Sequence, residues 1–270
     1  MKIFISVDIE GCAGVADWAE TERGNDDYEL FRKIMTDEVN STIDGLLDAG
    51  VNEIVVRDAH GTARNLLLDK LNPKVKIIRG WSNSPCEMMD GLDSSFDGVI
   101  FIGYHSPSRS DGNPLSHTLS LDRHNHIKLN GKILSEYHLN TYYAMTKGVP
   151  VILISGDKNI CQIASSENNL IETVETKAGL NGAIISRMPK EVLFELRQKA
   201  IDAINTLREH QKDDYQIFLP KNMELEIQYR KIDAANKASF YPGAIRLSAD
   251  KVIYRTNKIE DIFRFIFFCD

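Results

Sequence analysis

The chain has 270 residues and a formal net charge of −7 at pH 7, with 43% hydrophobic and 26% charged residues. This composition is ordinary for a soluble globular protein with one large domain, or one domain and a smaller second one. The acidic balance argues against a nucleic-acid partner, and no apolar stretch approaches the roughly 20 residues of a membrane span. We therefore expect neither nucleic acid nor a membrane as a partner.

Cysteine usage and the N-terminal segment bear on location. The first apolar run is short and is interrupted by Asp8 and Glu10, so it does not resemble a signal peptide. No two cysteines form a CxxC pair, which favours free thiols in a reducing cytoplasm. The four cysteines are Cys12, Cys86, Cys161 and Cys269.

Five short apolar runs rich in β-formers predict strands, and helical patterns separate several of them. Apolar residues at helical spacing over Asp27–Ala49, followed by Gly50, predict the first helix. We therefore expect an α/β fold: a three-layer α/β/α arrangement with a largely parallel or mixed sheet. Val99–Ile102 is wholly apolar and is expected at its centre. The expected strands are Lys2–Val7, Asn52–Arg57, Val75–Arg79, Val99–Ile102 and Val149–Ser155.

Asn130-Gly131 is a strong hairpin signal between two short apolar runs. Ser135 then predicts the cap of a further helix. After residue 190 the pattern becomes a long charged helix and alternating strands. We expect residues 1–190 to form a metal-binding catalytic α/β domain, and residues 191–270 to form a smaller C-terminal α+β portion with a role in oligomerisation. The later elements are expected at Glu191–His210, Met223–Tyr229, Ala244–Tyr254 and, as a helix or a strand, Phe263–Cys269.

Two carboxylates, Asp8 and Glu10, follow the first strand. Alternation places both side chains on the same face of an extended segment, where their charges repel. Burying either one costs several kcal/mol unless a cation compensates. A metal ion is the simplest such cation.

Further candidate ligands follow other strands and the hairpin. In open α/β sheets, small molecules and ions bind at the carboxyl ends of the strands. The candidate metal-binding side chains that follow these strands are therefore expected to converge. Two histidines and three carboxylates suit Zn²⁺, and also Mn²⁺ or Co²⁺. The expected metal ligands are Asp8, Glu10, His60, His105 and Glu136.

Five ligands exceed the three protein groups of an ordinary catalytic zinc site. They suit two ions roughly 3.5–4 Å apart that share one carboxylate. Asp8 is the expected bridge because it is short and stands at the strand end. Asp58 is more simply interpreted as a residue that orients His60 or caps the next helix, and Asp157 is a candidate for recognising a substrate amine.

Taken in order, these motifs resemble the zinc-dependent, DppA-like D-aminopeptidase family of metallopeptidases. The resemblance rests on Ser6-Val7-Asp8-Ile9-Glu10-Gly11 and on the short motifs that follow it, and it extends from residue 1 to about 190. The other matching motifs are Asp58-Ala59-His60, Gly103-Tyr104-His105, Ser116-His117, Asn130-Gly131 with Glu136, and Gly156-Asp157.

The resemblance implies a di-zinc aminopeptidase that hydrolyses the N-terminal amide bond of short D-amino-acid-containing peptides with metal-activated water. It assigns Asp8 to both ions and implies a homo-oligomer, a ring-based decamer. His117 matches the catalytic histidine of the family. Its role is open among a nucleophile, a proton shuttle and a group that stabilises the oxyanion.

Two alternatives remain at this point. A two-metal hydrolase of another amide or of a phosphoester would use the same ligand types, although no Gly-rich phosphate loop or basic cluster accompanies the motifs. A non-catalytic metal-binding assembly protein would enclose its metal completely.

Overall fold

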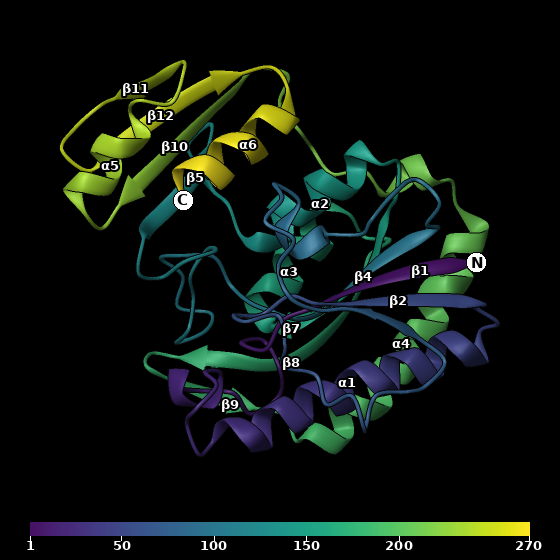
Figure 1. Cartoon of the computed structure of the whole chain (residues 1–270). Coiled ribbons are helices and arrows are strands. Elements are labelled where there is room, and N and C mark those ends of the chain that lie inside the picture. The colour runs from purple at the N-terminus through teal and green to yellow at the C-terminus, as the bar shows by residue number, and fades with distance from the viewer.

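The computed structural model describes residues 1–270, and its larger unit is built on a seven-stranded sheet (Figure 1). The strand order is β3-β2-β1-β4-β7-β8-β9, in which only β9 runs antiparallel to its neighbour. β4 is fully buried at the centre, as its apolar sequence predicts. The strands are β1 (Lys2–Val7), β2 (Glu53–Asp58), β3 (Lys76–Ile78), β4 (Gly98–Tyr104), β7 (Val151–Asp157), β8 (Glu172–Leu180) and β9 (Ala183–Ser186).

Helices cover both faces of this sheet, which confirms the expected three-layer α/β fold. α1 (Tyr28–Asp48) and α4 (Pro189–Glu209) lie side by side on one face, and α2 (Glu136–Thr146) and α3 (Lys158–Glu167) lie on the other (Figure 1). Gly45 of α1 permits the close approach of α4, because a Cβ there would lie 2.2 Å from the carbonyl oxygen of Arg197.

A second sheet forms a smaller unit with its own apolar core (Figure 1). Its strand order is β11-β12-β10-β5-β6, and all neighbours are antiparallel. The β5–β6 turn has positive φ at both Asn130 (48°) and Gly131 (83°), as a two-residue hairpin requires. Its elements are β5 (His124–Leu129), β6 (Lys132–Ile133), β10 (Met223–Tyr229), α5 (Ile232–Ala238), β11 (Ala244–Arg246), β12 (Lys251–Thr256) and α6 (Ile259–Cys269).

The two sheets do not divide the chain at residue 190, the boundary expected from the sequence. α4 packs on α1 and so belongs to the larger unit, because its buried stripe continues the main core. β5 and β6 lie early in the chain yet pair with β10 of the smaller unit. Three single-turn 3₁₀ helices complete the chain: η1 (Trp18–Glu20), η2 (Glu87–Met89) and η3 (Lys212–Tyr215). None of the helices has both the length and the apolar character of a membrane span.

Candidate metal centre

The parallel register brings the ends of three neighbouring strands together. β1 lies between β2 and β4, so Asp8 after β1 is flanked by His60 on one side and His105 on the other. Asp8 Oδ1 lies 3.2 Å from His60 Nδ1, and Asp8 Oδ2 lies 3.4 Å from His105 Nε2. The two oxygens of one carboxylate therefore face two different imidazoles.

The remaining candidates complete two groups of possible ligands. Glu10 Oε2 lies 3.1 Å from His60 Nδ1, and Glu136 Oε1 lies 3.6 Å from His105 Nε2. In the first group, Asp8, Glu10 and His60 offer ligand atoms within 4.8 Å of one another, and His105, His117 and Glu136 do so in the second. The structure thus brings all five expected ligands and His117 to one place.

Each histidine has one ring nitrogen against a backbone carbonyl. His60 Nε2 contacts the oxygen of Thr21 at 2.9 Å, and His105 Nδ1 contacts that of Ser106 at 2.9 Å. A carbonyl oxygen only accepts, so those nitrogens carry the proton and donate it. The opposite nitrogen then faces the centre and is the one that a metal ion would bind once its proton is lost, the arrangement usual for metal-bound histidine.

His117 follows the same pattern, with Nδ1 donating to the carbonyl oxygen of Leu115 at 2.8 Å. Its ring stacks on His105, and its Nε2 lies 3.7 Å from Glu136 Oε1. The edge of Trp18 packs against His117, with ring centroids 5.2 Å apart. His117 is therefore held in one orientation from both sides.

The electrostatics of the centre call for a cation. Burial and the charge of Glu10 raise the pKa of Asp8 to about 8. Burial opposes protonation of His105, but Glu136 and Asp8 outweigh it and raise the pKa of His105 to about 10. In the metal-free protein, protons on Asp8 and His105 therefore offset the negative charge of the buried carboxylates.

The imidazole and carboxylate groups of the centre suit a divalent metal ion. Glu10 Oε2 and His105 Nε2 are buried without any hydrogen-bond partner, which is costly unless a metal ion binds there. The mixed imidazole and carboxylate donors suit Zn²⁺. The side chains of all five candidate ligands are at most 11% exposed, so an ion bound there would be shielded from bulk water.

Loops and caps hold the ligands in place. Ser135 caps α2, so Glu136 stands in its first turn, and Glu136 Oε1 accepts from the backbone N–H of Leu119 at 2.8 Å. Asp58 accepts from the backbone N–H groups of Asn65 and Leu66 at 2.6 and 2.8 Å, which organises the loop that carries His60.

Asp157 does not face the centre. Its carboxylate caps α3 through Ile160 and accepts from the N–H and the hydroxyl of Ser106, both at 2.6 Å. It is fully buried, so the expectation that it recognises a substrate amine is not supported. Asp157 instead positions the residue that follows His105.

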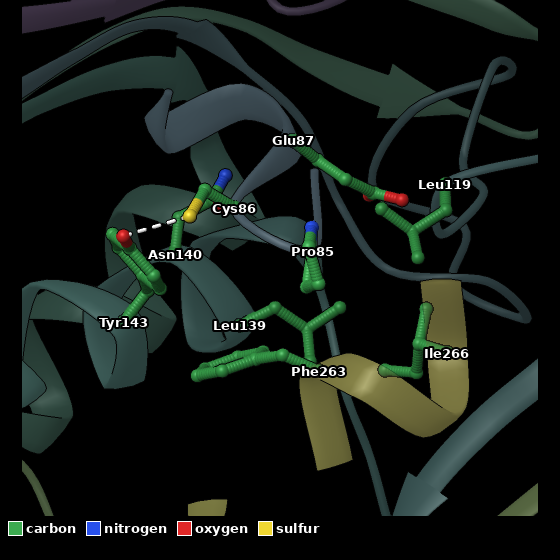
Figure 2. A pocket seen from close by; sticks show the side chains of 9 residues that line it. All are labelled: Pro85, Cys86, Glu87, Leu119, Leu139, Asn140, Tyr143, Phe263 and Ile266. Carbon is green, nitrogen blue, oxygen red and sulfur yellow. Dashed lines mark hydrogen bonds between the residues drawn. The ribbon is translucent and has the colours of Figure 1, made fainter. Parts of the chain in front are cut away.

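A small pocket lies beside the centre, where the two units meet (Figure 2). It has a volume of about 20 Å³, and α6 contributes Phe263 and Ile266 to its wall. Leu119, which donates to Glu136, and Asn140, one turn after Glu136, lie on the other side. Figure 2 also shows the contact of 2.8 Å between Cys86 Sγ and Tyr143 Oη.

A family model described as D-aminopeptidase matches residues 1–268. The chain belongs to the D-aminopeptidase family. Membership confirms the resemblance seen in the motifs and the expected class of enzyme, a hydrolase of the aminopeptidase type. The match extends beyond residue 190, where the motifs had ended.

A curated relative and a solved structure from this family can be compared with the chain. A D-aminopeptidase of Bacillus subtilis (strain 168) is 30% identical over 245 residues, which cover 90% of this chain and 86% of the relative. The solved structure of the Zn-dependent D-aminopeptidase DppA from Bacillus subtilis, described as a self-compartmentalizing protease, superposes with a TM-score of 0.89 at 28% identity. That alignment covers 100% of this chain and 96% of DppA.

Sequence reasoning missed the residues that support the centre from outside. Trp18, Glu38 and Lys177 were not singled out. The sequence does contain a signal for Glu38, because this carboxylate lies on the buried stripe of α1 with Met35 and Thr42. Lys177 left none, because its strand is too polar to be recognised from its pattern.

Proposed function

We propose that this chain is a di-zinc aminopeptidase that releases N-terminal D-amino acids from short peptides. The observation that carries the proposal is the Asp8 carboxylate, whose two oxygens face His60 and His105 on opposite sides. Zinc dependence of the Bacillus DppA supports zinc as the metal. Mn²⁺ or Co²⁺ would suit the same ligands.

The proposed ligand assignment follows the two groups of side chains. Asp8 would serve both ions, Glu10 and His60 would hold one, and His105 and Glu136 would hold the other, with His117 beside the second group. Zinc held by these residues would supply a water molecule of lowered pKa and would polarise the scissile carbonyl group.

His117 is proposed as the proton-transfer residue. Its Nδ1 donates to Leu115, so its Nε2 lone pair is free to accept a proton from the attacking water. The same Nε2 then donates that proton to the leaving amine. Leu115 and Trp18 keep the ring from turning away during these steps.

We also propose a homo-oligomer, and by family resemblance a decamer, in a cytoplasmic location. The description of DppA as self-compartmentalizing supports assembly, and exposed Phe194 and Phe240, each 79% exposed, are apolar surface that a partner subunit would cover. The region 191–270 contains both. Free cysteines are in keeping with a reducing compartment. Light scattering after gel filtration tests the assembly.

A substrate panel tests the activity. Purified protein with added Zn²⁺ is expected to cleave D-Ala peptides and amides faster than their L-Ala counterparts, to lose activity with a chelator and to regain it with Zn²⁺. Faster cleavage of the L-substrates, or indifference to the chelator, would contradict the proposal. Turnover of an aryl phosphate that is lost in His105→Ala would instead favour a phosphoesterase.

A further inference from the structure

The loop after β1, residues 10–15, turns several backbone carbonyl groups toward one buried ammonium group. Lys177 Nζ donates to the carbonyl oxygens of Glu10, Cys12 and Val15 at 2.5, 3.0 and 2.6 Å. Lys177 is 2% exposed and forms no ion pair with a carboxylate. All three of its N–H groups are therefore used to hold this one loop.

An irregularity in β8 aims a second side chain at the same loop. Gly156 pairs with Glu175 and Asp157 pairs with Lys177, so Thr176 is an extra residue in β8. The bulge breaks the alternation of the strand and buries Thr176 and Lys177 in succession. Thr176 Oγ1 lies 2.5 Å from the carbonyl oxygen of Gly11, the residue next to Glu10.

The opposite side of the loop is equally constrained. Glu38 of α1 accepts from the backbone N–H of Ala13 at 2.8 Å. Gly11 donates to the carbonyl oxygen of Gly103 at 2.8 Å, and a Cβ at Gly11 would lie 1.8 Å from the carbonyl oxygen of Tyr104. The peptide that carries the Glu10 side chain is thus enclosed by the bulge, by α1 and by β4.

We propose that Lys177 and Thr176 are positioning residues that fix Glu10 for the ion bound by Asp8, Glu10 and His60. The inference rests on the metal centre proposed above. Neither side chain forms a hydrogen bond or an ion pair with His105 or Glu136, so the second ion depends on them much less. A buried ammonium group costs several kcal/mol to desolvate, and an apolar side chain would serve a merely space-filling role better. The three hydrogen bonds that Lys177 donates to the loop of residues 10–15 account for the presence of a buried lysine here.

Selective loss of one zinc ion tests the inference. Lys177→Met keeps the length of the side chain and removes its donors. We expect the affinity for one of the two ions to fall about 10- to 100-fold, the range typical of residues that support metal ligands. The full chain is dialysed against increasing concentrations of a chelator, and elemental analysis measures the zinc that remains bound. The resulting curve gives the affinity for each of the two ions. Lys199→Met is the matched control, because Lys199 binds Glu172 of the same strand at 2.7 Å without reaching the loop.

A double-mutant cycle identifies the ion. Combined with Glu10→Ala, Lys177→Met is expected to cause little further loss, whereas with His105→Ala the losses are expected to add. Thr176→Val removes one hydrogen bond and keeps the shape, so it is expected to weaken the same ion about two- to tenfold. This milder variant carries the test if Lys177→Met does not fold.

If Lys177→Met lowers the affinity for both ions equally, the inference is wrong. If it lowers thermal stability and leaves both zinc affinities unchanged, the inference is also wrong and Lys177 has a structural role. Wild-type protein that binds fewer than two zinc ions would instead overturn the proposed function. The two failures are therefore distinguishable in one set of measurements.

Discussion

The imidazole rings of His105 and His117 stack face to face, with centroids 4.3 Å apart and planes inclined by 8°. Two positive charges at this distance repel, so the rings do not share the same task. His105 faces the carboxylates of Asp8 and Glu136, whereas burial and the neighbouring His105 lower the pKa of His117. His117 therefore remains neutral, with Nε2 free to accept a proton.

His117→Ala is expected to lower kcat about 10²- to 10⁴-fold, the contribution typical of a proton-transfer residue, while both zinc ions stay bound. Steady-state kinetics on a D-Ala peptide and elemental analysis measure the two properties separately. His126→Ala serves as the control, because His126 is a buried histidine paired with Glu226 in the second sheet. Loss of zinc in His117→Ala would make His117 a ligand.

Asp8→Ala is expected to abolish binding of both zinc ions, whereas Glu10→Ala is expected to weaken chiefly one. The reason is that Asp8 faces both histidines and Glu10 faces only His60. Zinc content after dialysis distinguishes the variants. If Asp8→Ala retains both ions at wild-type affinity, Asp8 is not the bridge.

Zinc affinity is expected to rise with pH between pH 6 and 8. In the metal-free protein the pKa of Asp8 is raised to about 8 and that of His105 to about 10, so both carry protons that zinc must displace. Each displaced proton changes the affinity by as much as about tenfold per pH unit. Calorimetric titration in buffers of different ionisation enthalpy counts these protons. An affinity independent of pH would contradict the prediction.

Glu38 makes stability depend on pH in the opposite direction to an ordinary ion-paired acid. Burial raises its pKa from 4.5 to about 7. Between these values only the unfolded chain ionises, so the free energy of unfolding falls as pH rises through this window, by about 3 kcal/mol at most. Glu38→Gln keeps an acceptor for Ala13 and is expected to flatten this part of the profile.

Urea unfolding of the wild type and Glu38→Gln between pH 4.5 and 8 measures the difference. Glu29→Gln, a change at a 67% exposed carboxylate of the same helix, is expected to keep the wild-type slope. Parallel profiles for the wild type and Glu38→Gln would show that Glu38 ionises normally in the folded protein.

The sequence predicts those parts of the fold whose pattern is local. β1 and β10 begin and end where they were expected, and Ser135 caps α2 as its position before the helix predicts. Ala244–Tyr254 resolves into the pair β11 and β12. The five candidate ligands could be found because each follows a recognisable strand or turn.

The remaining features depend on contacts between residues that are far apart in the sequence. β8 contains Glu172, Glu175 and Lys177, so its composition does not suggest a strand beside the loop that follows β1. The bulge at Thr176 is created by its register against β7 and has no local signal. Pairing of β5 with β10 likewise cannot be read from either segment alone, which is why the boundary at residue 190 differs from the observed units.

The pairing of β5 with β10 also sets when the protein can mature. The β5–β6 hairpin is made early, but its partner follows about 100 residues later, which corresponds to roughly 5–20 s of synthesis. A two-stranded hairpin alone is at best marginally stable in water. Glu136 follows this hairpin directly, and β10, made in the last quarter of the chain, completes the sheet beside it. A nascent chain stalled before β10 therefore contains all five candidate ligands but lacks the strand that pairs with the hairpin next to Glu136.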